Sequence, residues 1–324
     1  MNIATFAKRF WGRGLILILL ILLAAFPLLT TPLFGSDYPL IFLQAIFMFV
    51  ILTVSWAFFS GPTGYISLAP AAFFGIGIYT AAVLGKSLPL LATVAAAGIV
   101  SFILALLVGA VTLRLRGTFF AVFTFGLVVL IKELLLFWEI TVTGTRGRFV
   151  VLVDNDTIYY IVFGILLLTL FTTYFIRRSK IGLAMQSIGE NEEAAAHMGV
   201  NVTFVKVITF AISAIFMGAV GAIMATKWTY VDPYVAFDIR NSFLPVLMAI
   251  FGGVGTFYGP ILGSVIFSYL EELLLTKFPY YYMLAFGIIL VVVILYLPGG
   301  LASLIERLRQ RLQKGGLTGK HANT

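Results

Sequence analysis

Charge is scarce in this chain. Charged residues make up 10% of the 324 residues, whereas 61% are hydrophobic. The mean hydropathy is +1.09. A soluble protein of this length needs far more polar side chains to cover its surface. We therefore expect an integral membrane protein.

Cysteine is absent, and only His197 and His321 carry an imidazole. The first absence excludes disulfides and thiolate-ligated metals. With only two histidines besides, we expect no metal site. A membrane-embedded enzyme would need paired acids, a histidine or a metal cluster on inner helix faces, and none is visible in the sequence, so an enzyme is disfavoured and no catalytic residue is assigned.

Long uncharged runs are abundant. A helix needs about 20 apolar residues to cross the hydrocarbon core. Ten runs come close to this length: 15–33, 39–59, 65–84, 88–113, 118–138, 157–176, 204–226, 240–258, 260–276 and 280–297. The sequence thus predicts an all-α polytopic protein of about ten transmembrane helices, with a transmembrane domain over 1–305 and a basic tail over 306–324.

The first run follows three basic residues and has the look of a secretory signal. Its small pair, Ala24-Ala25, lies inside the run, and Pro27 follows instead of a polar mature start. These features favour an uncleaved first helix.

Lysine and arginine indicate the orientation, because cytoplasmic loops carry their excess. With the N-terminus inside, the inner side receives Lys8, Arg9, Arg13, Arg114, Arg116, Arg177, Arg178, Lys180, Lys206, Arg307, Arg309, Arg311, Lys314 and Lys320. The outer side receives Lys86, Arg146, Arg148, Lys227, Arg240 and Lys277. Both termini are therefore predicted to be cytoplasmic. This asymmetry also explains the net charge of +8 better than nucleic-acid binding does.

Two segments, 61–77 and 252–263, are dense in glycine and proline. Such segments disrupt a helix, and their freed backbone groups must be buried in protein or line a wet cavity. Broken helices in both halves of a transporter point to a solute path and to a possible inverted repeat. The candidate path residues are Gly61, Gly64, Tyr65, Ser67, Gly252, Gly253, Gly255 and Thr256. Close helix packing explains Gly75, Gly77 and Gly263 equally well.

No energy source is visible in the chain. The candidates for ionisable groups embedded in the membrane are Lys132, Glu133, Glu271 and Glu272, and all four lie toward the predicted outer ends of their spans, where they can pair or reach the interface. The nearest approach to a phosphate-binding loop is Gly85-Lys86-Ser87, but Thr80 stands where its first glycine belongs. Energy must come from a partner chain, or transport is passive.

The loop 177–201 suggests a partner. Ser187 and Glu190 have capping-box spacing, and Gly199 fits a left-handed C-terminal cap, so we predict a helix over 188–198. Apolar positions of the loop fall near one face: Ile181, Met185, Ile188, Ala195 and Met198. Glu190, Glu192 and Glu193 add negative charge around the helix start, where the helix dipole favours it. The helix could lie on the bilayer, but anionic lipids repel its acids, which favours a protein groove.

This loop resembles the EAA-type coupling loop of ATP-binding-cassette importer permeases, through Glu193-Ala194-Ala195 and Gly199. The stretch 188–201 is similar to the branched-chain amino acid permease family, specifically its M-type (LivM-like) subunit. Supporting blocks are 64–80, Arg114 to Ala121, 252–263 and Leu297 to Leu301. The likeness covers about residues 40–305. It departs at Gly189, where the family often has Arg, at Ala69-Pro70, which replaces Gly-His, and at 143–148.

The resemblance implies one half of a permease pair in the plasma membrane of a bacterium or archaeon. Partners would be an H-type permease chain, two cytoplasmic ATPases that bind ATP and Mg²⁺, and an extracytoplasmic solute-binding protein. The coupling residues would be Ser187, Glu190, Glu192, Glu193, Ala194, Ala195 and Gly199. The solute would be a branched-chain amino acid, urea or a short amide. A secondary carrier or channel working without ATPases is the alternative.

Overall fold

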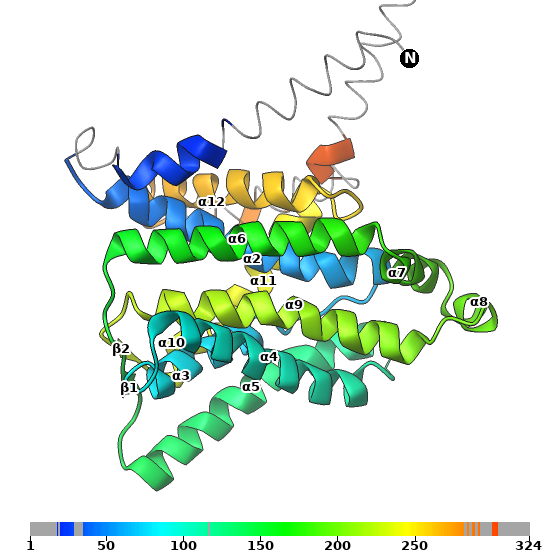
Figure 1. Cartoon of the computed structure of the whole chain (residues 1–324), viewed down its shortest axis with the longest axis horizontal. Helices are drawn as coiled ribbons and strands as arrows, with labels where there is room; N and C mark the ends of the chain where they lie inside the picture. The colour runs from blue at the N-terminus through cyan, green and yellow to red at the C-terminus, as the bar shows by residue number, and fades with distance from the viewer. Residues whose placement is uncertain are drawn as a thin grey trace, which may run out of the picture.

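A computed structural model (Figure 1) describes residues 18, 20–28, 35–115, 117–281, 284, 287–288, 291 and 300–303. The long helices are α2 (Tyr38–Thr63), α3 (Pro70–Leu84), α4 (Leu90–Thr112), α5 (Thr118–Trp138), α6 (Asn155–Arg177), α9 (Val202–Ala225), α11 (Arg240–Gly252) and α12 (Gly259–Lys277). The short elements are the π-helix η1 (Glu139–Thr143), β1 (Arg148–Phe149), α7 (Lys180–Glu190), α8 (Glu192–His197), β2 (Tyr230–Val231) and α10 (Pro233–Ala236).

Seven helical segments of the described part are long and apolar enough to cross a membrane, and α3 is a shorter apolar helix. The chain is therefore a multi-pass membrane protein. These helices match the predicted spans from 39–59 to 260–276. The described part of the first predicted span 15–33, residues 18 and 20–28, is helical. The last predicted span, 280–297, falls largely outside the described residues, and the tail over 306–324 lies entirely outside them.

Helices α2 and α9 form the centre of the bundle. In each of these helices, 72% of the most apolar stretch of 18 residues is buried, against 22% in the segment that contains α5. Glycines let α3 approach α9 closely: a Cβ on Gly77 would lie 2.0 Å from the Gly218 carbonyl oxygen. The packing interpretation of the small residues therefore holds at Gly77, and also at Gly75 and Gly263, where a Cβ would meet Phe237 and the Met248 carbonyl.

Two predicted spans end differently in the structure. The span 65–84 is helical only from Pro70, because Gly64 adopts φ 72° and stops α2, and residues 65–69 are irregular. The span 240–258 is helical only to Gly252, since Gly253 adopts φ 104° and a turn leads into α12. Left-handed glycines thus end both helices where hydropathy alone extends them.

The irregular segment 64–69 is bonded by side chains from three helices. Trp56 donates to the Ser67 carbonyl at 2.7 Å, and Thr124 accepts from the Leu68 amide at 2.9 Å. Ser242 donates to the Leu68 carbonyl at 2.8 Å and accepts from the Ala71 amide at 3.2 Å. These bonds replace those that a regular helix would make, which the membrane interior requires.

The bundle has two distinct ends (Figure 1). Helices α7 and α8 lie at one end, and η1, α10 and the antiparallel pair of β1 with β2 lie at the other. The ionisable groups singled out within the spans have neighbours to pair with. Arg240 contacts Glu271 at 3.1 Å, Lys132 contacts Glu133 at 3.3 Å, and the Tyr38 hydroxyl donates to Glu272.

Candidate functional site at the α7–α8 end

The loop 177–201 folds into two short helices, so the predicted single helix over 188–198 is wrong. Ser187 does not cap a helix: it lies inside α7 and its hydroxyl donates to the Leu183 carbonyl at 3.0 Å. Asn191 is extended, ends α7, and caps α8 by accepting from the Ala194 amide at 2.9 Å. Asparagine is among the best N-cap residues, so the sequence already offered Asn191 as an alternative N-cap to Ser187.

The C-terminal cap of α8 is confirmed. Gly199 adopts φ 87°, its amide donates to the Ala196 carbonyl, and the Val200 amide donates to the Ala195 carbonyl. This pair of bonds is the Schellman motif, which satisfies the last carbonyls of a helix. Helix α8 is therefore capped at both ends despite its short length.

The predicted apolar face is largely present. Met185, Ile188 and Ala195 are buried in one cluster with Val205 of α9, and Ile181 packs on it. Met198 does not join them and is 81% exposed, because the chain turns at Gly199. This small core holds α7 and α8 against the end of α9.

Helix α7 also packs on the end of α2. A Cβ on Gly189 would lie 2.1 Å from the Pro62 carbonyl oxygen, so a larger residue there requires the helices to move apart. The departure at Gly189 noted above thus has a steric reason in this chain.

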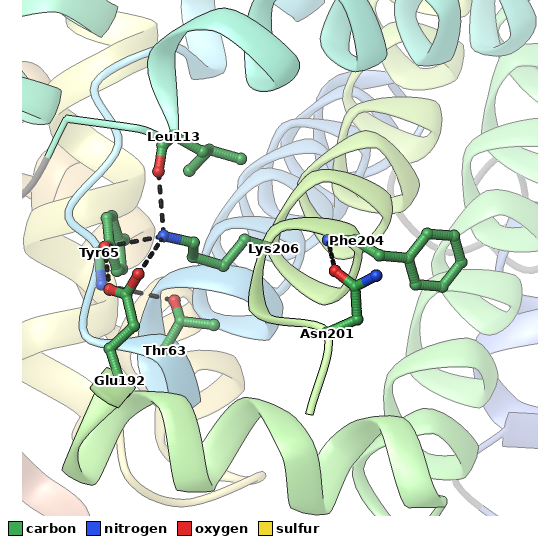
Figure 2. A network of polar contacts seen from close by, with 7 residues as sticks. All are labelled: Thr63, Tyr65, Leu113, Glu192, Asn201, Phe204 and Lys206. Atoms are coloured by element: carbon green, nitrogen blue, oxygen red, sulfur yellow. Dashed lines mark hydrogen bonds and ion pairs between the residues drawn. The ribbon is translucent and has the colours of Figure 1, made fainter. Parts of the chain in front are cut away.

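The neighbouring acids at the start of α8 point in different directions. Glu193 is exposed, whereas Glu192 points into the bundle (Figure 2). Its carboxylate accepts from the Lys206 ammonium at 2.9 Å and from the Tyr65 hydroxyl at 2.5 Å. Lys206 is 3% exposed and also donates to the Tyr65 hydroxyl oxygen and to the Leu113 carbonyl, both at 3.0 Å. Glu190 ends α7 and takes no part in these hydrogen bonds.

Lys206 is a residue of this site that lies outside the loop 177–201. In the sequence it belongs to the basic residues of the inner side and is the third residue of the run 204–226. A lone cation inside an apolar run is expected to have a buried partner, and that signal points to Lys206.

The candidate path residues lie in several places. Gly61 approaches Val254 in the turn after α11, and Arg177 donates to the Val254 carbonyl at 3.4 Å. Gly252 ends α11, and Gly253, Gly255 and Thr256 belong to the turn that follows, where Thr256 accepts from the Gly259 amide. These segments and α7 border a cleft of about 190 Å³, lined by Gly61, Pro62, Arg177, Gln186, Glu190, Val254 and Gly255.

Ser67 lies elsewhere, beside a small cavity inside the bundle. This cavity offers about 10 Å³ to the centre of a water molecule and is also lined by Trp56, Ser60 and Phe210. That is room for about one water. Gly64 caps α2 and Tyr65 belongs to the Lys206 cluster, so the structure does not bring the eight residues together as one site.

Comparison with known proteins extends over most of the chain. The family model described as "Branched-chain amino acid transport system / permease component" matches residues 38–294. No solved structure matches the chain.

Individual relatives agree with the family match. The high-affinity branched-chain amino acid transport system permease protein LivM of Salmonella typhimurium is 26% identical over 309 residues, covering 85% of this chain and 72% of the relative. LivM of Escherichia coli is 25% identical with the same coverage. LivH of Escherichia coli is 29% identical over 101 residues, 31% of this chain and 32% of the relative. The chain therefore belongs to the family of branched-chain amino acid transport system permease components.

Proposed function

We propose that the chain is a permease subunit of an ATP-binding-cassette importer and forms half of the path for a branched-chain amino acid or a similar small polar solute. Family membership supports the transport role. The observation that carries the coupling role is the geometry of α8, which is capped at both ends and presents Glu193 to solvent while Glu192 holds it to the bundle.

This geometry suits contact with a motor protein. Helix α8 exposes an acid in its first turn and small side chains, Ala194 and Ala196, beyond it. A groove on a cytoplasmic ATPase can accept such a helix end, and nucleotide binding there would displace it. Hydrolysis of ATP, with Mg²⁺, takes place on those partner subunits.

A second permease chain completes the path. The cavity beside Ser67 admits about one water, which is too small for an amino acid. Passage at the surface between two permease chains avoids that limit. The relatives include both LivM and LivH permease proteins, which supports a pair of unlike chains.

The other expected parts complete the proposal. An extracytoplasmic solute-binding protein delivers the solute at the end that carries β1 and β2, and the host membrane is the bacterial inner membrane. Urea and short amides remain in the proposed solute class.

The test is a charge reversal combined with loss of the cap. Glu193→Lys with Gly199→Pro in the assembled complex should abolish uptake and the stimulation of ATP hydrolysis by solute-loaded binding protein. Both are measured in proteoliposomes. Unchanged stimulation and uptake would refute the coupling role of α8, and gradient-driven uptake by this chain alone would establish a secondary carrier instead.

A further inference from the structure

We infer that Glu192, Lys206 and Tyr65 form a linkage through which a displacement of α8 reaches the irregular segment 64–69. This inference rests on the proposed role of α8 as the helix that contacts the ATPase. It assigns a positioning role to Lys206, which lies outside the coupling loop.

The bonding of Lys206 is saturated. A lysine ammonium has three N–H donors, and the structure supplies three acceptors: the Glu192 carboxylate at 2.9 Å, the Tyr65 hydroxyl at 3.0 Å and the Leu113 carbonyl at 3.0 Å. The second carboxylate oxygen of Glu192 accepts from Tyr65 at 2.5 Å. Because charge-assisted bonds are short and directional, α8 cannot shift much without moving or breaking them.

Burial makes these bonds costly to replace. The side chain of Lys206 is 4% exposed and that of Glu192 is 21% exposed. Water has little access to the ammonium, and an unpaired buried charge carries a large penalty. When α8 moves, Lys206 and Tyr65 are therefore expected to move with Glu192, because breaking their bonds to it costs more.

The linkage joins parts that are far apart in the sequence. Glu192 starts α8, Lys206 belongs to α9, Leu113 follows α4, and Tyr65 follows the cap of α2 (Figure 2). Two and three residues after Tyr65, the carbonyls of Ser67 and Leu68 accept hydrogen bonds from Trp56 and Ser242. A shift at Tyr65 is thus applied to the point where α2, α5 and α11 meet.

The first experiment reads the irregular segment directly. Ile66 is 50% exposed and the chain has no cysteine, so Ile66→Cys provides a single thiol on this chain. Its rate of reaction with a small membrane-permeable maleimide is followed by mass on this chain in the assembled complex. We expect the rate to change between the nucleotide-free and the vanadate-trapped state, and expect Lys206→Met to abolish that change.

The second experiment measures solute carried per ATP hydrolysed. The loss of one charge-assisted hydrogen bond changes an equilibrium constant by about tenfold. Glu192→Gln and Lys206→Met should each lower the ratio about tenfold, and the double variant should lower it no further. Tyr65→Phe keeps the ring against Phe120 and should give a smaller fall. Assembly of each variant complex is checked by size-exclusion chromatography. If the Lys206→Met complex does not assemble, Tyr65→Phe tests the linkage in its place.

The matched control is Lys132→Met, which removes a cation paired with Glu133 at 3.3 Å in α5. It should leave the ratio unchanged. If the Glu193 and Gly199 variant uncouples the complex while Lys206→Met and Tyr65→Phe keep both the ratio and the response at Ile66, the linkage is refuted and the proposed function stands. If the Glu193 and Gly199 variant has no effect either, the proposed function fails.

Discussion

At the scale of single residues, α8 is held by a local cap at Gly199 and by the distant partners of Glu192. Glu192 and Glu193 lie in the first turn of the capped helix α8 and Gly199 follows its end, as the sequence predicts, because caps are local features. Glu190 instead ends α7. The partner of Glu192 was not found, since Lys206 and Tyr65 are distant in the sequence and meet only after folding. A sequence pattern contains no such contact.

Gly199 has a backbone conformation that other residues rarely adopt. Its φ of 87° is unfavourable for L side chains, and no atom lies within 4 Å of the position that a Cβ would occupy. Gly199→Ala should therefore lower the free energy of unfolding by about 1 kcal/mol through backbone strain alone. Gly199→Asn should recover much of this loss, because asparagine tolerates the left-handed region. Thermal denaturation in detergent measures both, and equal stabilities for alanine and glycine would contradict the explanation.

At the scale of elements, hydropathy located the helices but not their breaks. Residues 65–69 include Tyr, Ile, Leu and Ala, so the apolar signal continues across a segment that is not helical. What makes the break stable is a set of bonds from Thr124 and Ser242, which lie in other helices. The dense glycines did signal the irregularity, although not its limits.

The contact between α3 and α9 gives a prediction at this scale. Gly77→Ala places a methyl 2.0 Å from the Gly218 carbonyl oxygen, which only separation of the helices can relieve. We expect a loss of about 1–3 kcal/mol in stability. Gly126→Ala is the matched control, because it lies in α5 with no atom within 4 Å of its Cβ position. Thermal unfolding of both variants in detergent checks this, and an equal effect at both positions would mean that close packing is not the cause.

At the scale of the whole molecule, the basic residues at the two ends of the bundle predict its orientation in the membrane. Arg177, Lys180 and Lys206 lie at the α7–α8 end, and Arg146 and Arg148 lie near β1. The positive-inside rule, applied to the whole sequence, assigns the α7–α8 end to the cytoplasm.

Single cysteines test this orientation, because the chain has none of its own. Met198 is 81% exposed at the α7–α8 end, and Phe149 is 63% exposed at the other. A membrane-impermeant maleimide should label Met198→Cys only in inside-out vesicles and Phe149→Cys only in right-side-out vesicles. The opposite pattern would reverse the topology and remove α8 from the reach of any cytoplasmic ATPase.

The bonds that hold segment 64–69 also constrain how the protein is made. Thr124 is 56 residues and Ser242 is 174 residues away from Leu68 along the chain. During synthesis α2 and α3 therefore enter the membrane before the side chains that complete their junction exist. Until α11 is inserted, the Leu68 carbonyl needs water or another temporary partner. The junction between α2 and α3 is thus among the last parts of the described bundle to mature.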